Sequence, residues 1–216
     1  NELLGDYDSQ IASVHDPDEY LAAATDDDDY QKRYTDVLEA YRALADLKKK
    51  GVVAGIGIGA KDWRSIEKIS KDVQLDWVMI ANSYTIYNHP KELVDFVEAL
   101  HQKGITIINS AVFHGGFLMG SDYFNYIQLS RENPEHASYY KWRDRFNELC
   151  TEYNITPPAA AIYFGLHIPG VKSIALNSSN PKRVRHNIEM ANAEIPAVFW
   201  QRMKEDGLID KDYSHL

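Results

Sequence analysis

The chain has 216 residues, 44% of them apolar and 25% charged, which is enough material to bury one sizeable core. Its net charge of -9 argues against nucleic acid as a partner. A single cysteine, Cys150, excludes an internal disulfide and is typical of a cytoplasmic protein. No apolar run approaches the ~20 residues that span a bilayer, so we expect no membrane partner.

The first half of the sequence alternates short apolar segments with longer amphipathic ones. The apolar segments have the length of strands, and the amphipathic segments have apolar residues at helical spacing. The acidic run at 26–29 is predicted to be a solvated loop. The predicted strands are 10–15, 52–58, 75–81 and 105–110, and the predicted helices are 34–50, 62–70 and 89–104.

The second half is predicted to be mostly helical. Its first segment, 113–135, contains three glycines and a proline and is predicted to be irregular. The elements predicted after it are helices at 137–153 and 157–167, a buried strand at 171–176 and a last amphipathic helix at 196–206.

The stretch after the last predicted strand has the features of an anion site. Asn180 is predicted to cap a helix that has Pro181 at its first position. Lys182 and Arg183 add positive charge in the first turn, where exposed N–H groups could bind a phosphate. The alternative is an ordinary strand-to-helix turn with a solvated basic first turn.

Short apolar strands that alternate with amphipathic helices predict a parallel sheet covered by helices. Five such units are present, which suits either a doubly wound sheet or the later part of a (β/α)8 barrel. In either fold, ligands gather beyond the carboxyl ends of the strands. The polar and aromatic residues predicted to converge there lie at 15–18, 59–63, 82–84, 109–116 and 177–180.

The order of these segments resembles the aldo-keto reductases, which are NAD(P)-dependent (β/α)8 barrels, and within them the branch of L-fucose, D-galactose and D-threo-aldose dehydrogenases. The resemblance rests on VHDPD, GIGIGAKDW, ANSYTIYN, INSAVFHGGFLMG and IPGVKSIALNSSNPKRVRHN. It implies an α/β fold of the TIM-barrel type. Residues 1–216 would then be a single domain, strands 4–8 with their helices, the C-terminal two thirds of the barrel. A closed barrel takes about 250 residues. We therefore expect the intact protein to have roughly a hundred more residues before Asn1, or else this chain to be a remnant of a broken barrel.

The resemblance also implies roles for individual residues. His15 matches the active-site histidine, which hydrogen-bonds the reacting oxygen as hydride moves. Trp63 and Tyr84 match loops that line the sugar pocket, with core packing as the alternative for both rings. The residues that match the dinucleotide site are Ser110, Phe113, Gly115, Asn177, Ser178, Asn180, Arg183 and Asn187. The cofactor is NAD or NADP, with NAD slightly favoured because Asn177 stands where NADPH-preferring members often have a lysine.

The chain departs from the family pattern at several positions. Gly59, Ala60 and about Ala81 stand where much of the superfamily binds the nicotinamide carboxamide, so that role is not transferred. Ser110 stands where a tyrosine usually stacks on the nicotinamide. The family's catalytic aspartate, tyrosine and lysine lie on the first three βα units, which precede the matched region.

Three functions compete at this point. The first is an NAD(P)-dependent oxidoreductase that moves hydride to or from the carbonyl or lactol carbon of a sugar, with His15 at the substrate oxygen. The second is a catalytically inactive partial barrel or nucleotide-binding scaffold. The third is another phosphate-binding barrel enzyme, an aldolase or isomerase, which needs a Schiff-base lysine or a metal cluster. Lys61, and His15 with Asp16 and Asp18, are poor candidates for these, so we predict no metal and favour the first function. No pattern indicates an oligomeric state.

Overall fold

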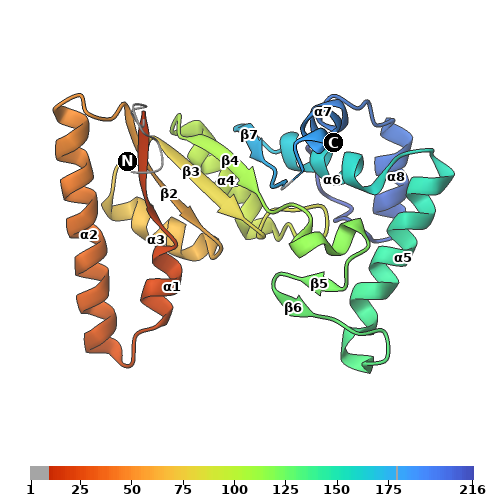
Figure 1. The fold of residues 1–216 in the computed structure, drawn as a ribbon, viewed down its shortest axis with the longest axis horizontal. Helices are drawn as coiled ribbons and strands as arrows, with labels where there is room; N and C mark the ends of the chain where they lie inside the picture. Colours follow the sequence, from red (N-terminus) through yellow and green to blue (C-terminus); the bar gives the residue numbers. More distant parts are fainter. Residues whose placement is uncertain (1–9, 179) are drawn as a thin grey trace.

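The structure is a computed structural model that describes residues 10–178 and 180–216. A five-stranded sheet forms its centre, with all neighbouring strands parallel in the order β1-β2-β3-β4-β7. Figure 1 shows this order from β1 on the left to β7 near the middle of the view. The strands are β1 (Ile11–His15), β2 (Gly55–Ala60), β3 (Trp77–Ala81), β4 (Thr106–Ser110) and β7 (Val171–Ala175). The predicted parallel arrangement of the five strands is confirmed.

Helices connect the strands, and two elements have no counterpart in the prediction. One is the helix α1, and the other is a hairpin of β5 (Tyr123–Phe124) and β6 (Ile127–Gln128) within the segment expected to be irregular. Two 3-10 helices, η1 (His114–Met119) and η2 (Pro134–His136), lie on either side of this hairpin. The α-helices are α1 (Pro17–Ala22), α2 (Asp27–Lys49), α3 (Trp63–Asp72), α4 (Lys91–Gln102), α5 (Ala137–Glu152), α6 (Pro157–Leu166), α7 (Lys182–Ala191) and α8 (Ala197–Glu205).

The acidic run at 26–29 belongs to α2 and is not a loop. Asp26 caps the helix, because its carboxylate accepts a hydrogen bond from the N–H of Asp29 at 2.8 Å. The aspartates that follow form the first turn, where the partial positive charge of the helix N-terminus favours acidic side chains. The prediction placed the helix start at residue 34 because the apolar spacing begins only after this turn.

The two faces of the sheet differ. Side chains alternate between faces along a strand, and residues paired in register share a face. One face, called the helix face, carries Ile58, Val78, Ile80 and Ile107, which are buried in the main core with residues of α2, α3, α4 and α6. The other face, called the glycine face, carries Gly55, Gly57 and Gly59 of β2.

Gly57 leaves room for the indole ring of Trp77 on the glycine face. A Cβ atom on Gly57 would lie 2.3 Å from Cδ2 of Trp77 and 2.5 Å from its carbonyl oxygen. Both distances are far inside van der Waals contact. The repeat GIGIG therefore sends isoleucines toward the helices and leaves space where a neighbouring side chain lies across the strand.

β1 and β7 are the edge strands, which corrects the prediction of a buried strand at 171–176. Each pairs with one neighbour in the described sheet, and its residues are half-buried or exposed. Apolar runs alone predicted burial on both sides, as in an interior parallel strand. An edge strand lacks a neighbour on one side, so its side chains are covered mainly on the helix face.

Candidate functional site

The carboxyl ends of the five strands lie along one edge of the sheet, called the rim below. Register places His15 beside Gly59, and Ala81 beside Ser110, which pairs in turn with β7. The loops that follow the strands therefore start next to one another, as predicted. Residue 179, part of the predicted turn after β7, lies outside the described residues.

His15 is the last residue of β1, and its side chain is 82% exposed. The ring lies on the glycine face, where a Cβ atom on Gly59 would be 3.7 Å from Nδ1 of His15. Nε2 is 3.6 Å from Oδ2 of Asp16, too far for a strong hydrogen bond. The imidazole is therefore free to hydrogen-bond a ligand at the rim.

An ionic cluster lies beside His15. Lys61 follows β2 directly, is hydrogen-bonded to Glu19, and has its Nζ 3.7 Å from Oδ2 of Asp16. The hydrogen bond raises the pKa of Lys61 above its ordinary value and lowers the pKa of Glu19. The pair is open to solvent and contributes little to stability. It does fix one cation and two carboxylates close to His15.

Asp18 holds the backbone at this part of the rim through hydrogen bonds. Its side chain is buried, and Oδ2 accepts hydrogen bonds from the N–H of Lys61 at 3.1 Å and of Asp62 at 2.8 Å. Asp18 thus ties α1 to the start of α3. Within the described residues, no group of three His, Cys, Asp or Glu side chains is arranged to hold a metal ion. The same part of the chain contains no helix that is both long and apolar enough to cross a membrane.

Tyr126, at the tip of the β5–β6 hairpin, reaches the ionic cluster. Nζ of Lys61 is 5.2 Å from the centroid of its ring, and Tyr126 is 77% exposed. Figure 1 shows both the hairpin and α1 in the lower half of the view. Sequence reasoning missed Tyr126 because the turn Asn125–Tyr126 lacks the glycine that usually signals a hairpin. It missed Glu19 because α1 was not predicted.

Trp63 and Tyr84, predicted to line a sugar pocket, are in the core. Trp63 is 7% exposed and stacks on Phe96 with ring centroids 5.8 Å apart. Tyr84 is 1% exposed, and its hydroxyl lies 3.1 Å from the hydroxyl of Tyr213. Tyr84 lies in the apolar interior, and Trp63 is largely buried with the guanidinium of Arg64 at 4.5 Å from its ring centroid. This burial agrees with the alternative of core packing, and a substrate contact by either ring stays a prediction.

His114 fixes the loop after β4 from inside the protein. Its Nδ1 is 3.0 Å from Oδ1 of Asn125, an oxygen that can only accept, so Nδ1 carries the proton. Its Nε2 is 2.5 Å from Oγ1 of Thr85. Burial lowers the pKa of His114 to about 4, which keeps the ring neutral near pH 7. A neutral imidazole thus joins the loop after β3 to the β5–β6 hairpin.

The predicted cofactor residues that follow β4 differ in accessibility. Ser110 is buried and its hydroxyl donates to the carbonyl oxygen of Ile80 at 3.4 Å, whereas Phe113 is half-buried. Gly115 is exposed with a φ of 68°. A Cβ atom on Gly115 would lie 3.3 Å from the backbone of the hairpin, so glycine suits this position in both conformation and space.

The remaining predicted cofactor residues follow β7. Asn180 holds the turn, because its Oδ1 accepts from the N–H of Lys182 at 3.0 Å and its carbonyl oxygen from the N–H of Arg183 at 3.0 Å. Ser178 donates to the same carbonyl oxygen at 3.0 Å. The prediction of Asn180 as the cap and Pro181 as the first helical residue is corrected: α7 begins at Lys182 with Pro181 at the cap position, and Asn180 holds the turn just before it. The exposed members are Asn177, Ser178, Asn180 and Arg183, and Asn187 is half-buried.

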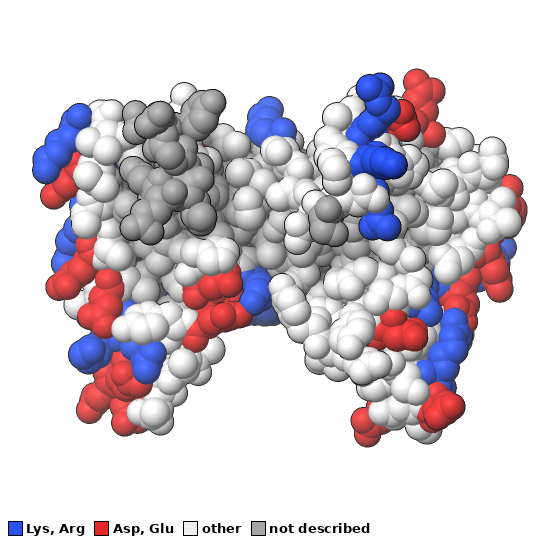
Figure 2. Space-filling model, viewed as in Figure 1, with Lys and Arg blue, Asp and Glu red and all other residues white. Residues whose placement is uncertain are grey.

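A phosphate-bearing ligand at this turn would meet side chains and not free backbone N–H groups. Asn180 already occupies the N–H groups of Lys182 and Arg183, which the prediction had left open. Arg183 is exposed and forms no ion pair within the described part of the chain. Figure 2 shows basic side chains gathered on the surface around α7. Since β4 pairs with β7, the two groups of predicted cofactor residues come at or after the ends of neighbouring strands.

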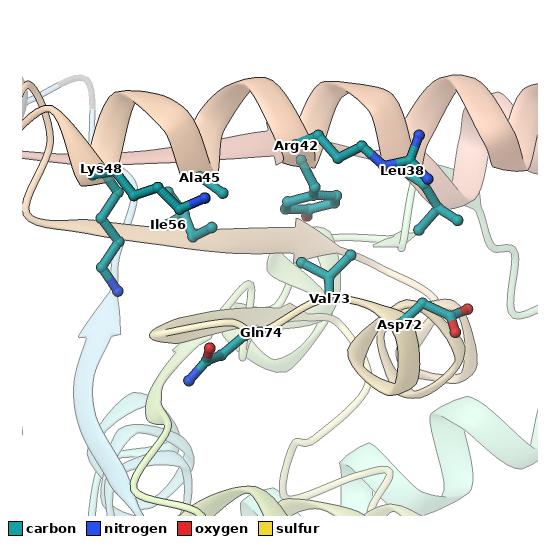
Figure 3. Close-up of a pocket in the computed structure, with 10 residues that line it drawn as sticks. Leu38, Arg42, Ala45, Lys48, Ile56, Asp72, Val73 and Gln74 are labelled. Carbon is teal, nitrogen blue, oxygen red and sulfur yellow. The ribbon is translucent and has the colours of Figure 1, made fainter.

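A cavity of about 490 Å³ lies on the helix face, away from the rim (Figure 3). It is found between α2 and the segment that joins α3 to β3, over Leu38, Ile56 and Val73. Lys48 at its edge pairs with Asp76, just before the amino end of β3. None of the predicted site residues lines this cavity, so it is not part of the candidate site.

Comparison with known proteins identifies relatives over most of the chain. The family model described as "Aldo/keto reductase family" matches residues 3–206. Pyridoxal 4-dehydrogenase of Microbacterium luteolum is 27% identical over 173 residues, covering 78% of this chain and 48% of the relative. D-threo-aldose 1-dehydrogenase of a Pseudomonas species is 30% identical over 175 residues, covering 79% and 51%. The chain spans about half the length of the curated relatives it matches.

Solved structures agree with this comparison at the level of the fold. The holo form of an aldo-keto reductase from Bacillus halodurans superimposes with a TM-score of 0.61 at 18% identity, covering 96% of this chain and 61% of that chain. Its apo form gives a TM-score of 0.62 at 19% identity, covering 99% and 69%.

Proposed function

The chain belongs to the aldo/keto reductase family, and from this premise we propose that the protein carrying it is an NAD(P)-dependent oxidoreductase acting on an aldose or a related carbonyl–alcohol pair. The observation that carries the proposal is His15, exposed at the carboxyl end of β1. Lys61 and Asp16 beside it supply a donor and an acceptor for substrate hydroxyls. The names of the two curated relatives support an aldehyde or aldose as substrate.

The fold proposal is that the sheet forms strands 4–8 of a (β/α)8 barrel, with residues 1–216 as one domain. Five strands cannot close around a filled interior. The glycine face, which carries His15 and Trp77, would then face that interior. Three further βα units would cover it and bring the aspartate, tyrosine and lysine that the family uses. The match of this chain to only about half the length of the curated relatives supports the proposal of further βα units.

Hydride transfer to or from the substrate carbon requires a hydrogen-bond donor at the substrate oxygen. When bound, the nicotinamide ring supplies or accepts the hydride. His15 would donate to the carbonyl or lactol oxygen and stabilise the negative charge that builds up there. Its exposure on the glycine face, without a strong hydrogen bond to Asp16, leaves it available for this role.

The cofactor would lie across the loops after β4 and β7. Ser110, Phe113 and Gly115 would line the first part of it, and the turn after β7 would hold the adenosine end. NAD is slightly favoured, because Asn177 offers no charge to a 2′-phosphate, while Arg183 keeps NADP as the alternative. A cytoplasmic location stays a prediction from the single cysteine.

The test of this function is the variant His15→Ala in a protein that has three βα units ahead of this chain. We expect kcat for an aldose to fall about 10²-fold or more, because charge stabilisation at the oxygen is lost. Cofactor affinity, measured by fluorescence titration, should stay within about twofold. His101→Ala, at an exposed histidine on α4, is the matched control. A wild-type kcat in His15→Ala would remove His15 from the mechanism.

The competing functions make different use of the same rim. A Schiff-base aldolase needs a neutral lysine, and the contact with Glu19 raises the pKa of Lys61, which favours the ammonium. A nucleotide-binding scaffold without catalysis would bind the dinucleotide but turn over no aldose. The same assay therefore separates the scaffold from the oxidoreductase.

A further inference from the structure

We propose that Tyr126 contacts the substrate and, together with Lys61 and Asp16, selects polyhydroxylated sugar rings over apolar carbonyl compounds. The inference rests on the oxidoreductase function proposed above and adds a specificity-determining residue to it. Tyr126 comes from the β5–β6 hairpin and takes the place of Trp63 and Tyr84, which are buried in the core.

The first observation is where the ring lies. The hairpin carries Tyr126 to the rim at the end of β2, and the ring stays 77% exposed. Lys61 is within cation–π distance of the ring, at 5.2 Å from its centroid. Figure 2 shows a notch in the surface at the lower edge of the view, with acidic and basic atoms together at its upper end. A large aromatic side chain there gains little from burial, so packing does not explain it.

The second observation is the backbone of the hairpin tip. Asn125 has a φ of 46° and Tyr126 a φ of 75°, both in the left-handed region. Two-residue hairpin turns of this kind usually carry glycine at the second position, and a bulky residue there is strained by about 1–2 kcal/mol. The tip is nevertheless held, because Asn125 is hydrogen-bonded to the buried His114 through both its side chain and its N–H. Strain that a protein maintains in this way is typical of ligand sites.

The third observation is the sequence of chemical groups along the rim. The ring of Tyr126 is followed by the ammonium of Lys61, the carboxylate of Asp16 and the imidazole of His15. A sugar ring presents C–H groups on one face and hydroxyls at its edge. The C–H face suits the aromatic ring, and the hydroxyls suit a fixed donor and acceptor. A lactol without further hydroxyls would make none of these contacts with Lys61 and Asp16, and would therefore gain less binding energy at this site.

The experiment compares two lactols in the protein with three βα units ahead of this chain. L-Fucose carries ring hydroxyls, and 2-hydroxytetrahydropyran has the same reacting group without them. In Tyr126→Ala we expect KM for L-fucose to rise about three- to tenfold, the range of one aromatic contact, with kcat within about twofold. KM for 2-hydroxytetrahydropyran should change less than twofold, and Tyr126→Phe should restore the wild-type KM for L-fucose.

Two further variants separate a substrate contact from a structural role. Tyr123→Ala removes the other exposed tyrosine of the hairpin and should leave KM unchanged. Tyr126→Gly should raise the melting temperature, because glycine accepts a positive φ, while it raises KM for L-fucose like Tyr126→Ala. A structural role would instead lower stability and activity together.

The experiment distinguishes a failure of the Tyr126 proposal from a failure of the proposed oxidoreductase function. Equal KM changes for both lactols, or none, would overturn the role of Tyr126. If the wild-type protein oxidises neither lactol with NAD or NADP, the proposed function fails. Saturation-transfer NMR with L-fucose on the wild type and Tyr126→Ala then still decides whether the ring holds a sugar: loss of the signal in the variant supports the contact, and an unchanged or absent signal excludes it.

Discussion

In the proposed cofactor site, Arg183 is the residue expected to decide between NAD and NADP. It is exposed in the first turn of α7, and Asn180 occupies the nearby N–H groups. A phosphate would therefore be held by the guanidinium and not by free backbone donors. A guanidinium–phosphate pair is a charge-assisted contact, stronger than a neutral hydrogen bond.

We expect Arg183→Ala to weaken dinucleotide binding, with a loss about tenfold larger for NADP than for NAD if the guanidinium pairs the 2′-phosphate. Dissociation constants from fluorescence titration measure this directly. Arg185→Ala, two positions along the same exposed helix, is the control and should change neither constant by more than about twofold. Small, equal effects of Arg183→Ala on both cofactors would place Arg183 outside the site.

Single aromatic residues show where sequence reasoning reaches its limit. Trp63 and Tyr84 follow β2 and β3, but whether each side chain turns to the core or to the rim depends on neighbours such as Phe96 and Tyr213. Tyr126 has no apolar pattern around it that would mark it out, and its place at the rim depends on a contact with Lys61 from another segment. His15 could be placed because it ends a strand whose register the fold determines.

At the scale of elements, β2 shows how a strand depends on its neighbour. The apolar segment 52–58 predicted a strand, which the structure has at Gly55–Ala60, but the segment did not show why its glycines are there. That reason lies in Trp77 of β3, which pairs with Gly57 and covers it. Gly59, on the same face of the same strand, has only ordinary contacts, with Met79 at 3.8 Å and His15 at 3.7 Å from its would-be Cβ.

This difference predicts that alanine at the two glycines will change the free energy of unfolding by very different amounts. Gly57→Ala should lower the free energy of unfolding by about 3 kcal/mol, because its Cβ would clash with both the ring and the backbone of Trp77. Gly59→Ala should change the free energy of unfolding by less than about 1 kcal/mol. Urea unfolding followed by tryptophan fluorescence measures both. A tolerated Gly57→Ala would mean that β2 and β3 pack less closely than described.

The elements that the sequence did not indicate share a cause. α1 has a single turn and a half, and its start depends on Asp16 in a left-handed conformation, which no apolar periodicity can show. The β5–β6 hairpin has strands of two residues each and a turn without glycine. The longer elements, with clear periodicity, were predicted within a few residues, except for the capped first turns of α2.

At the scale of the whole molecule, the two faces of the sheet differ in what lies on them. The helix face holds the main core, while the glycine face leaves His15 and Ile11 exposed. Within the described residues, β1 and β7 each pair with one neighbouring strand. This arrangement agrees with the proposal that further βα units complete the sheet, and it places His15 where such units would meet it.

Proton transfer is the step for which the described residues offer no tyrosine–lysine pair joined by a hydrogen bond at the rim. Hydride transfer to a carbonyl needs a proton donor near the oxygen, commonly a tyrosine assisted by a lysine in this family. Within the described residues, Lys68 donates to the hydroxyl of Tyr30 at 2.8 Å, but this pair lies on α3 and α2 and not at the rim. At the rim, Lys61 contacts the ring of Tyr126 and not its hydroxyl in a hydrogen bond.

We therefore expect the 216-residue chain alone to show no measurable dehydrogenase activity on L-fucose, D-arabinose or D-galactose with either cofactor. Loss of a general acid costs about 10²–10⁴ in rate, and loss of the strands that shape the pocket costs positioning as well. Adding three βα units ahead of the chain should restore turnover, followed as cofactor reduction at about 340 nm. Size-exclusion chromatography of both proteins controls for association through the open edges. Clear turnover by a monomeric 216-residue chain would show that its own rim, with His15, Lys61 and Tyr126, contains a working proton donor.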